Sequence, residues 1–421
     1  MTTTASTPTV DERPSATAPA PRGRRAHTRR RHGYGFWAVA FAFTAVMAFA
    51  TVPAPLYVIY QQRDGFPTFT TTIVFAAYGV GVVGSLWLAG HLSDVHGRRP
   101  LILVSIALEL VAAVVFLFWN DVAGLLVARL VTGLGVGTLT ATATAHLGEL
   151  RIRATGDDRS AKTASVAAGV VNLGGLSLGA LVGGALAEFV GQPLMVPYVV
   201  FLVALVVAFV LVLAVPETVD RPAEPVPYHP QRLQAPAGKA AAFWTAGTAA
   251  FAALAVQGLF TSVAPTFLGT TFHVTDRLAA GATTFGVFAA SALSQVVFAR
   301  LAQRAQIRLG MVLLVGGLAV LAVSAVVLQV GGFIGGGVVA GAGVGLLFRA
   351  SIGSAGALVG PSERGGVLAA TFLIAYAGLT VPVVAVGAAL LVLPTLPVLI
   401  GYVVLVAVLA VVAGTRLAAR A

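Results

Sequence analysis

The chain is built from long apolar runs, and no other feature limits its possible folds as strongly. About 20 apolar residues, at roughly 1.5 Å per residue, are needed for a helix to cross ~30 Å of hydrocarbon. Runs of this length recur almost from end to end. We place spans at roughly 36–58, 70–90, 100–118, 122–147, 163–187, 195–215, 242–268, 279–300, 309–329, 332–358, 366–391 and 396–414.

These runs favour helices over the strands of a membrane barrel. Barrel strands alternate apolar and polar residues, whereas the segment VVFLVALVVAFVLVLAV at 199–215 is apolar on every face. A composition of 58% hydrophobic and 10% charged residues also excludes a water-soluble domain. The sequence therefore predicts an all-α integral membrane protein with twelve transmembrane helices.

The positive charge follows membrane topology. If both termini lie on one side, nearly all of the 26 Lys and Arg residues fall on that side. The exceptions are Arg63 and Arg277 on the opposite side, and Arg129 and Arg349 inside predicted spans. This distribution predicts cytoplasmic termini and does not indicate a nucleic-acid surface. A chain rich in Arg, Ala, Gly and Val but poor in Lys is typical of a GC-rich bacterial genome, so we expect a bacterial plasma (inner) membrane.

A polar, proline-rich segment divides the spans into two sets of six. The N-terminal segment is rich in Thr, Pro and Ala and then becomes basic, which is typical of disorder. We therefore expect a disordered basic cytoplasmic arm at 1–35, a six-helix bundle at 36–215, a cytoplasmic linker at 216–240, a second six-helix bundle at 241–415 and a cytoplasmic tail at 416–421.

The two sets of spans resemble each other. Three short matches occur in the same order: Ala54-Pro55 with Ala264-Pro265 at an offset of 210, Gly133–Gly137 with Gly341–Gly345 at 208, and Gly175-Leu-Ser177 with Gly378-Leu-Thr380 at 203. They indicate two parallel six-helix repeats, and the alternative is chance similarity between small apolar residues. Parallel repeats are the frame of alternating-access carriers.

The segment between spans 2 and 3 carries the most specific motif. Its spacing is Gly90-x-x-x-Asp94-x-x-Gly97-Arg98-Arg99, and it resembles the signature of the major facilitator superfamily. The glycines permit a tight turn, and Asp94 can pair with Arg98 or a helix end. We expect a conformational latch here, the alternative being that the arginines only anchor topology. The corresponding loop of the second half, at 299–306, has lost the carboxylate and a glycine, which predicts an asymmetric latch.

Span 4 carries a second motif, which begins with an arginine inside the span. Arg129 opens the pattern R-x-x-x-G-x-G-x-G, which resembles the fourth helix of the same superfamily. Burying an arginine costs about 2.5–3.5 kcal/mol on insertion scales, so it needs a cavity or a partner. Glu109 in span 3 lies at a similar depth, which predicts a pair across the two spans. Such a pair could couple proton movement to shape change, or it could be a permanent structural ion pair.

Span 5 resembles the antiporter motif of the superfamily. Gly175, Gly179, Gly183 and Gly184 match, but Ala180 replaces the motif's proline. Small residues at this spacing let helices approach closely and could limit leakage between the halves, or they could serve ordinary helix packing. Without the proline, the kink that the resemblance implies is not expected.

Four polar residues inside spans are candidates for the substrate cavity: Asn172, Gln257, Arg349 and Tyr376. Each could equally satisfy a hydrogen bond between helices. The chain has no cysteine and no histidine cluster, so we predict no metal site. It also lacks a Walker motif, which argues against ATP as the energy source within this chain. Its glycine-rich segments lie in apolar helices rather than after a strand, so they are not dinucleotide-binding loops. We therefore expect no cofactor, with a proton gradient as the energy source.

The resemblance implies a secondary active transporter rather than an enzyme. We expect a monomer in the lipid bilayer that exports a small amphipathic, drug-like compound by proton antiport, with no nucleic-acid partner. A sugar or other metabolite exporter or permease of the same superfamily is the first alternative. A non-transporting receptor or assembly partner is the second, although the latch and the buried Arg129 argue against a static protein.

Overall fold

The computed structural model describes residues 22–89, 92–157, 160–219 and 235–421. All regular structure in these ranges is α-helical. Twelve helical segments are long and apolar enough to cross a membrane, which confirms the predicted fold class. A bilayer interior offers the backbone no hydrogen-bond partners, so each apolar run satisfies its own amides and carbonyls by forming a helix.

In the described ranges, eight helices form the N-terminal half and seven form the C-terminal half. The first set is α1 (Arg22–Thr51), α2 (Pro53–Asp64), α3 (Thr68–Ala89), α4 (Leu92–His96), α5 (Arg98–Phe118), α6 (Val122–Thr155), α7 (Ser160–Phe189) and α8 (Val196–Leu213). The second set is α9 (Ala240–Ser262), α10 (Ala264–Thr271), α11 (Arg277–Val297), α12 (Gln303–Val326), α13 (Val330–Gly356), α14 (Pro361–Ala389) and α15 (Thr395–Arg420).

The first span of each half is broken near its end. Pro53 begins α2 directly after α1, and Pro265 lies in the first turn of α10 directly after α9. Proline lacks an amide hydrogen and clashes with the preceding turn, so a helix changes direction there. The Ala-Pro match between the halves therefore marks the same local structure twice.

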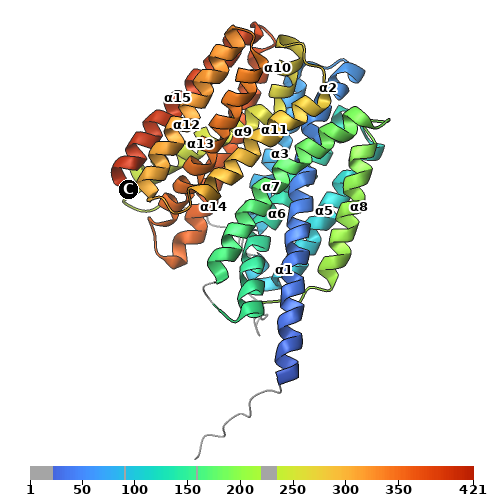
Figure 1. The fold of residues 1–421 in the computed structure, drawn as a ribbon, viewed down its shortest axis with the longest axis vertical. Helices are drawn as coiled ribbons and strands as arrows, with labels where there is room; N and C mark the ends of the chain where they lie inside the picture. Colours follow the sequence, from blue (N-terminus) through green and yellow to red (C-terminus); the bar gives the residue numbers. More distant parts are fainter. Residues whose placement is uncertain (1–21, 90–91, 158–159, 220–234) are drawn as a thin grey trace, which may run out of the picture.

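The first helix begins earlier than the sequence analysis predicted. The arm was expected to be disordered through residue 35, but α1 begins at Arg22, directly after Pro21. Arginine is a good helix former, and no proline interrupts the segment from there into the first span. Figure 1 shows this part of α1 extending below the bundle.

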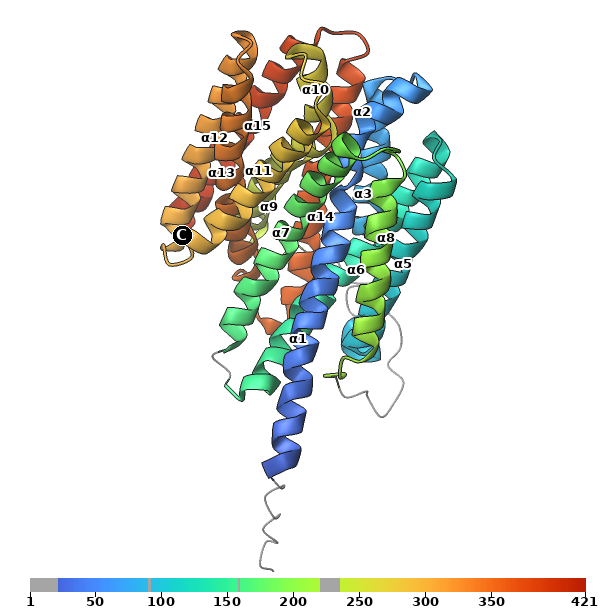
Figure 2. The same cartoon turned by 45° about the vertical axis from the view of Figure 1, so that its right-hand side comes forward.

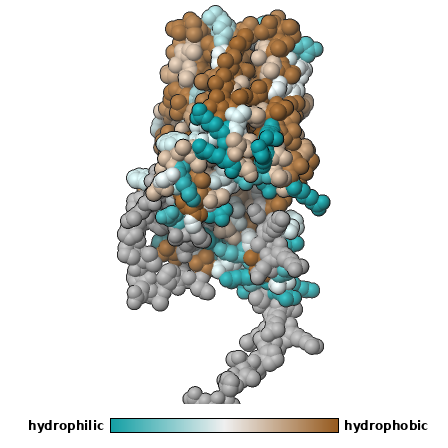
Figure 3. Space-filling view, turned by 90° about the vertical axis from the view of Figure 1, so that its left-hand side faces the viewer, coloured by the Kyte–Doolittle hydropathy of each residue, from teal (hydrophilic) through white to brown (hydrophobic). Residues whose placement is uncertain are grey.

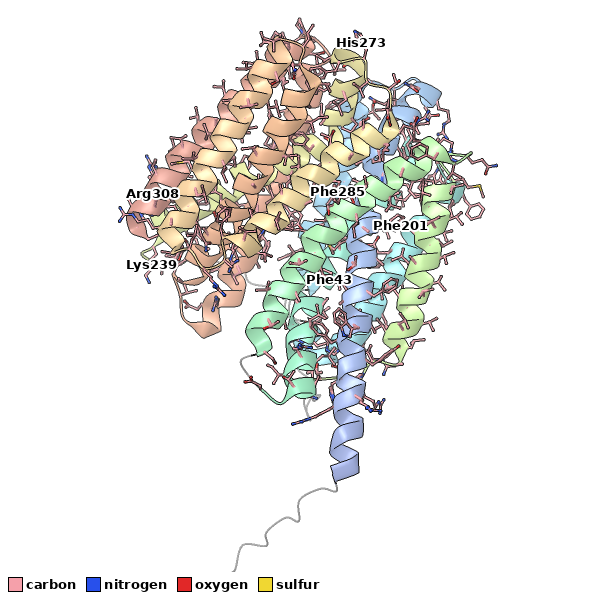
Figure 4. All side chains as sticks on the ribbon, viewed as in Figure 1. Phe43, Phe201, Lys239, His273, Phe285 and Arg308 are labelled. Atoms are coloured by element: carbon pink, nitrogen blue, oxygen red, sulfur yellow. The ribbon has the colours of Figure 1, made fainter. Side chains whose placement is uncertain are left out.

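The two halves meet along two helix pairs. Helix α7 packs against α11, and α3 packs against α14, as Figures 1 and 2 show from two directions. We call the end at which α1 enters the bundle the basic end, since most Lys and Arg residues of the described part of the chain lie there. Figure 4 shows Lys239 and Arg308 at this end and His273 at the opposite end.

The outer surface is apolar. Val203 and Val210 on α8 and Val312 and Val323 on α12 are each more than half exposed. In Figure 3 the C-terminal face carries a broad apolar band above hydrophilic side chains near the basic end. Such a continuous band is far larger than the exposed apolar patches of soluble proteins, and it fits a multi-pass membrane protein.

The repeated glycine motif brings helices into backbone contact in both halves. A Cβ at Gly133 on α6 would overlap the Tyr78 carbonyl on α3, and one at Gly345 on α13 would overlap the Ser291 carbonyl on α11. Only glycine permits these approaches. The motif thus fixes α6 on α3 and α13 on α11, the equivalent helices of the two halves.

Candidate functional site

A small cavity of about 50 Å³ lies between the halves. Its walls come from both halves and combine aromatic side chains with a few polar groups. They include Thr51, Phe75, Tyr78 and Arg129 from the N-terminal half, and Gln257, Thr261, Phe288 and Tyr376 from the C-terminal half. Arg129 is the only charged residue among the described residues that line this cavity.

Arg129 is held by α1 and α3. Only 1% of its surface is exposed. Its Nη1 donates a hydrogen bond of 2.6 Å to the Ala50 carbonyl, and its guanidinium carbon lies 4.6 Å from the centre of the Tyr78 ring and 5.7 Å from that of Phe75. The negative faces of aromatic rings attract a guanidinium, so these contacts partly replace its hydration. The charge is therefore stabilised without a carboxylate.

Glu109 does not form the predicted ion pair with Arg129. Its side chain is fully buried, and neither carboxylate oxygen has a hydrogen-bond partner among the described residues. The carboxylate lies against Gly135, where an added Cβ would be 2.5 Å from Oε1. Gly135 is six residues beyond Arg129, or about 9 Å along α6. Arg129 turns instead to Ala50 and acts on Glu109 only through space.

The second half has no counterpart of Arg129. At the repeat offset of 208 stands Gly337 on α13, and a Cβ there would overlap the ring of Phe260. Phe260 itself occupies the position that matches Ala50 at the offset of 210. A phenylalanine ring thus fills the place that the arginine side chain takes in the first half.

The motif after α3 forms a network at the basic end, which we call the latch. Arg98 donates to Ser93 Oγ at 2.6 Å and lies 3.3 Å from a Glu149 oxygen at the end of α6. Gly90 and the side chain of Asp94 lie outside the described part of the chain. The part that is described ties the short α4, the start of α5 and the end of α6 together.

Glu217, just after α8, closes the latch. Its two oxygens accept hydrogen bonds of 3.0 Å from the backbone amides of Arg98 and Arg99. Gly97 has a φ of 99°, and an added Cβ would lie 2.6 Å from a Glu217 oxygen, so only glycine fits there. Thr218 adds a hydrogen bond to Glu149. The sequence analysis missed Glu149 and Glu217, although a carboxylate directly after the sixth span is a usable signal.

The antiporter-like glycines of α7 serve two different contacts. Gly175, Gly179 and Gly183 lie against Thr44, Ala48 and Val52 on and just after α1, within the N-terminal half. Gly184 alone reaches the other half, where it contacts the Arg277 carbonyl and Gly281 at the start of α11. The motif therefore touches the boundary between the halves at its last residue only.

Polar groups join the halves at the end opposite the basic end. The Arg277 amide donates to Glu188 at 3.0 Å, and the Arg277 guanidinium lies 3.8 Å from the same carboxylate. Thr266 on α10 donates to Gln61 on α2 at 3.2 Å. These contacts hold α7 to α11 and α2 to α10.

Comparison with known proteins identifies the family. The model of the Major Facilitator Superfamily matches residues 36–381. The chain belongs to the Major Facilitator Superfamily. It is therefore a transporter of a superfamily whose members in general move solutes rather than catalyse reactions.

Solved structures share the fold of this major facilitator protein. The human organic anion transporter MFSD10 (TETRAN) is 16% identical with a TM-score of 0.63, covering 94% of this chain and 100% of that one. A variant of the nucleoside transporter NupG is 10% identical with a TM-score of 0.66, covering 91% and 99%. A POT family transporter in complex with 5-aminolevulinic acid is 12% identical with a TM-score of 0.73, covering 91% and 95%.

A curated relative matches over a short stretch. It is an uncharacterized transporter from Rickettsia bellii (strain RML369-C), 30% identical over 82 residues. The matched stretch is 20% of this chain and 20% of that relative.

The four predicted cavity residues separate in the structure. Gln257 and Tyr376 line the central cavity with Arg129. Arg349 lines a different cavity, because its side of α13 turns toward α11 and α7. Asn172 is half-buried on α7 and lines neither of these two cavities. Sequence reasoning missed Phe75 and Tyr78, the aromatic partners of Arg129.

Proposed function

We propose that this transporter exports a small amphipathic organic compound in exchange for protons. One observation carries the proposal: Glu109 is a fully buried carboxylate without a hydrogen-bond partner in the described structure, and it interacts through space with Arg129, which lines the central cavity. Placing an ionisable group at membrane depth costs free energy, so the groups found there generally serve a function. We further propose that the protein sits in the bacterial plasma membrane with both termini in the cytoplasm and works as a single chain without a cofactor.

Protonation of Glu109 changes the net charge around the cavity. A charged Glu109 attracts the Arg129 guanidinium, and a protonated one leaves it to the Ala50 carbonyl and the Tyr78 ring. The pair is close to neutral in the first case and positive in the second. A compound that binds best beside the neutral pair is released when a proton binds, which is the competition that antiport requires.

The cavity walls favour an uncharged or weakly charged amphipathic compound. Phe75, Phe288 and Tyr376 offer apolar and aromatic surface, whereas Gln257 and Thr261 offer hydrogen bonds. A cavity of about 50 Å³ is smaller than a drug-sized ligand needs, so the halves must part further before loading.

A polar metabolite is the second candidate. Thr51, Gln257 and Thr261 place hydroxyl and amide groups on the cavity wall, which suits a sugar or a nucleoside-like compound.

Everted membrane vesicles test the proposal. A pH gradient, acid inside, is set up, and its dissipation is followed on adding antibiotics, lipophilic cations, sugars or nucleosides. One class of compound should dissipate the gradient with the native protein and with Glu363→Gln, which removes an exposed carboxylate. Glu109→Gln and Arg129→Ala should abolish this response.

Counterflow of a labelled compound separates coupling from transport. Glu109→Gln should still exchange labelled for unlabelled compound without a gradient, because only the titrating group is lost. Proton-coupled export by Glu109→Gln at the native rate would overturn the assignment of the coupling residue. Uptake of the compound into the cell in symport with protons would overturn the proposed direction.

A further inference from the structure

A second cavity, of about 200 Å³, lies between the halves toward the basic end. Val166, Gly169 and Val170 of α7 form one wall, and Gln295 and Val296 of α11 form the other. Arg349 of α13 lines it from behind the α11 wall. Because α7 belongs to the first half and the other two helices to the second, the cavity spans the boundary between the halves.

Arg349 supplies the only charge among the described residues that line this cavity. Its Nη1 donates a hydrogen bond of 2.6 Å to the Gln295 carbonyl. It forms no ion pair within the described part of the chain, although a guanidinium carries five N–H donors. An arginine in apolar surroundings is stabilised by an anion, and a planar guanidinium matches a phosphate with two parallel hydrogen bonds.

Arg349 lies in the last third of α13, toward the basic end. It stands seven residues before Gly356, the end of α13, or about 10 Å along the helix axis. From there its long side chain can reach toward the membrane surface. Val166, Val170 and Val296 are 37%, 43% and 40% exposed, so the cavity opens on apolar surface.

We propose that this cavity binds the phosphate of an anionic phospholipid from the leaflet at the basic end. Arg349 holds the phosphate, and an acyl chain lies along the valines of α7 and α11. A free phosphate offers the same group to Arg349 but leaves the apolar walls uncovered, which favours the lipid. Basic pockets between helices on the cytoplasmic side are suited to anionic headgroups. A lipid here contacts both halves and therefore stabilises the arrangement in which α7 and α11 lie together.

Native mass spectrometry of the detergent-purified protein measures this binding directly. Phosphatidylglycerol is titrated against the native chain, and phosphatidylcholine serves as the neutral lipid. Arg349→Gln should weaken binding of phosphatidylglycerol about fivefold, the effect of about one basic side chain near a headgroup. Val170→Trp should weaken it similarly by filling the cavity, and Arg349→Lys should retain most of it.

Arg308→Gln is the matched control, since it removes one positive charge from the basic end. Arg308 lies on α12 at the far edge of the molecule, as Figure 4 shows, and its variant should bind phosphatidylglycerol as the native chain does. Equal weakening by Arg308→Gln and Arg349→Gln would overturn the proposal in favour of nonspecific surface charge. Competition by millimolar glycerol 3-phosphate would instead assign the site to a soluble phosphate. The assay needs no transport, so its result is independent of the proposed export.

Discussion

Arg277 at the start of α11 holds Glu188 at the end of α7, with its backbone amide 3.0 Å from the carboxylate and its guanidinium 3.8 Å away. Beside this pair, Gly184 and Gly281 bring the two helices into backbone contact. The contact joins the two halves at the end opposite the latch. Opening that end requires the charge pair to separate and the glycine contact to part.

Glu188→Gln should therefore favour opening at this end. Both side chains are about one-third exposed, so the pair contributes at most about 1 kcal/mol, which corresponds to a two- to fivefold shift. The chain has no cysteine, so Ala280→Cys introduces a single buried thiol on α11. A membrane-impermeant maleimide should label this thiol two- to fivefold faster in Glu188→Gln. Asp64→Asn, which breaks the Arg63–Asp64 pair within α2, should leave the labelling rate unchanged.

Gly133→Ala should destabilise the protein markedly. The new methyl group would overlap the Tyr78 carbonyl, and neither backbone has a flexible end that can move away. We expect a loss of about 1–3 kcal/mol or more in the free energy of unfolding, seen as a lower melting temperature of the purified protein. Gly148→Ala is the control on the same helix, because no heavy atom lies within 4 Å of its added Cβ. That variant should be as stable as the native chain or slightly more stable.

Tyr78→Leu should remove the cation–π contact that stabilises the Arg129 guanidinium, whereas Tyr78→Phe should retain it. The guanidinium carbon lies 4.6 Å from the ring centre, and a phenylalanine keeps the ring. Loss of the ring should cost about 0.5–2 kcal/mol in stability and reduce transport. Melting temperature and vesicle transport measure the two effects. Equal losses in both variants would show that the tyrosine hydroxyl matters more than the ring.

The latch should resist mild acid. Burial raises the pKa of Glu217, but hydrogen bonds from the amides of Val219, Thr218, Arg98 and Arg99 outweigh it, so the pKa lies below its ordinary value of 4.5. A carboxylate with a lowered pKa stabilises the fold above its ordinary pKa and loses this effect as the pH falls through the lowered value. Hydrogen exchange of the Arg98 and Arg99 amides should stay slow down to about pH 5, once corrected for intrinsic rates.

Glu217→Gln should speed exchange of those two amides at every pH. The two amides bind different oxygens of Glu217, and glutamine replaces one of these oxygens with an NH2 donor. The resulting loss of about 1–3 kcal/mol corresponds to roughly fivefold to 150-fold faster exchange. Glu363→Gln, on the exposed first turn of α14, should leave their exchange unchanged. Slow exchange in Glu217→Gln would show that the latch is held by Arg98 and Glu149 instead.

The sequence predicted those parts of the fold that depend on local pattern. Twelve spans follow from apolar runs because a helix in lipid satisfies its own backbone. The close packing of α7 on α1 follows from Gly175, Gly179 and Gly183, since small residues at this spacing let helices approach closely. The burial of Arg129 follows from its position inside an apolar run.

Contacts that depend on helix rotation or on distant loops could not be predicted. Residue counts along α5 and α6 placed Glu109 and Arg129 at similar depths in the membrane. The depth of a residue does not determine the direction in which its side chain points. The rotation of α13, which directs Arg349 toward α11 and α7, could not be predicted for the same reason. Glu217 lies 119 residues from Arg98, and no local pattern links the two.

The difference between the halves sets how much energy the proposed proton-coupled cycle would have for transport. Among the described residues, Glu109 is the only fully buried acidic side chain, and the second half has Gly337 and Phe260 where Arg129 and Ala50 would recur. If Glu109 is the coupling residue, as proposed, one proton is exchanged in each transport cycle. One charge crossing 100 mV releases about 2.3 kcal/mol, and about 1.4 kcal/mol corresponds to a tenfold ratio. Export of an uncharged compound would therefore stop when the outside-to-inside concentration ratio has risen by a factor of about fifty for every 100 mV of proton-motive force.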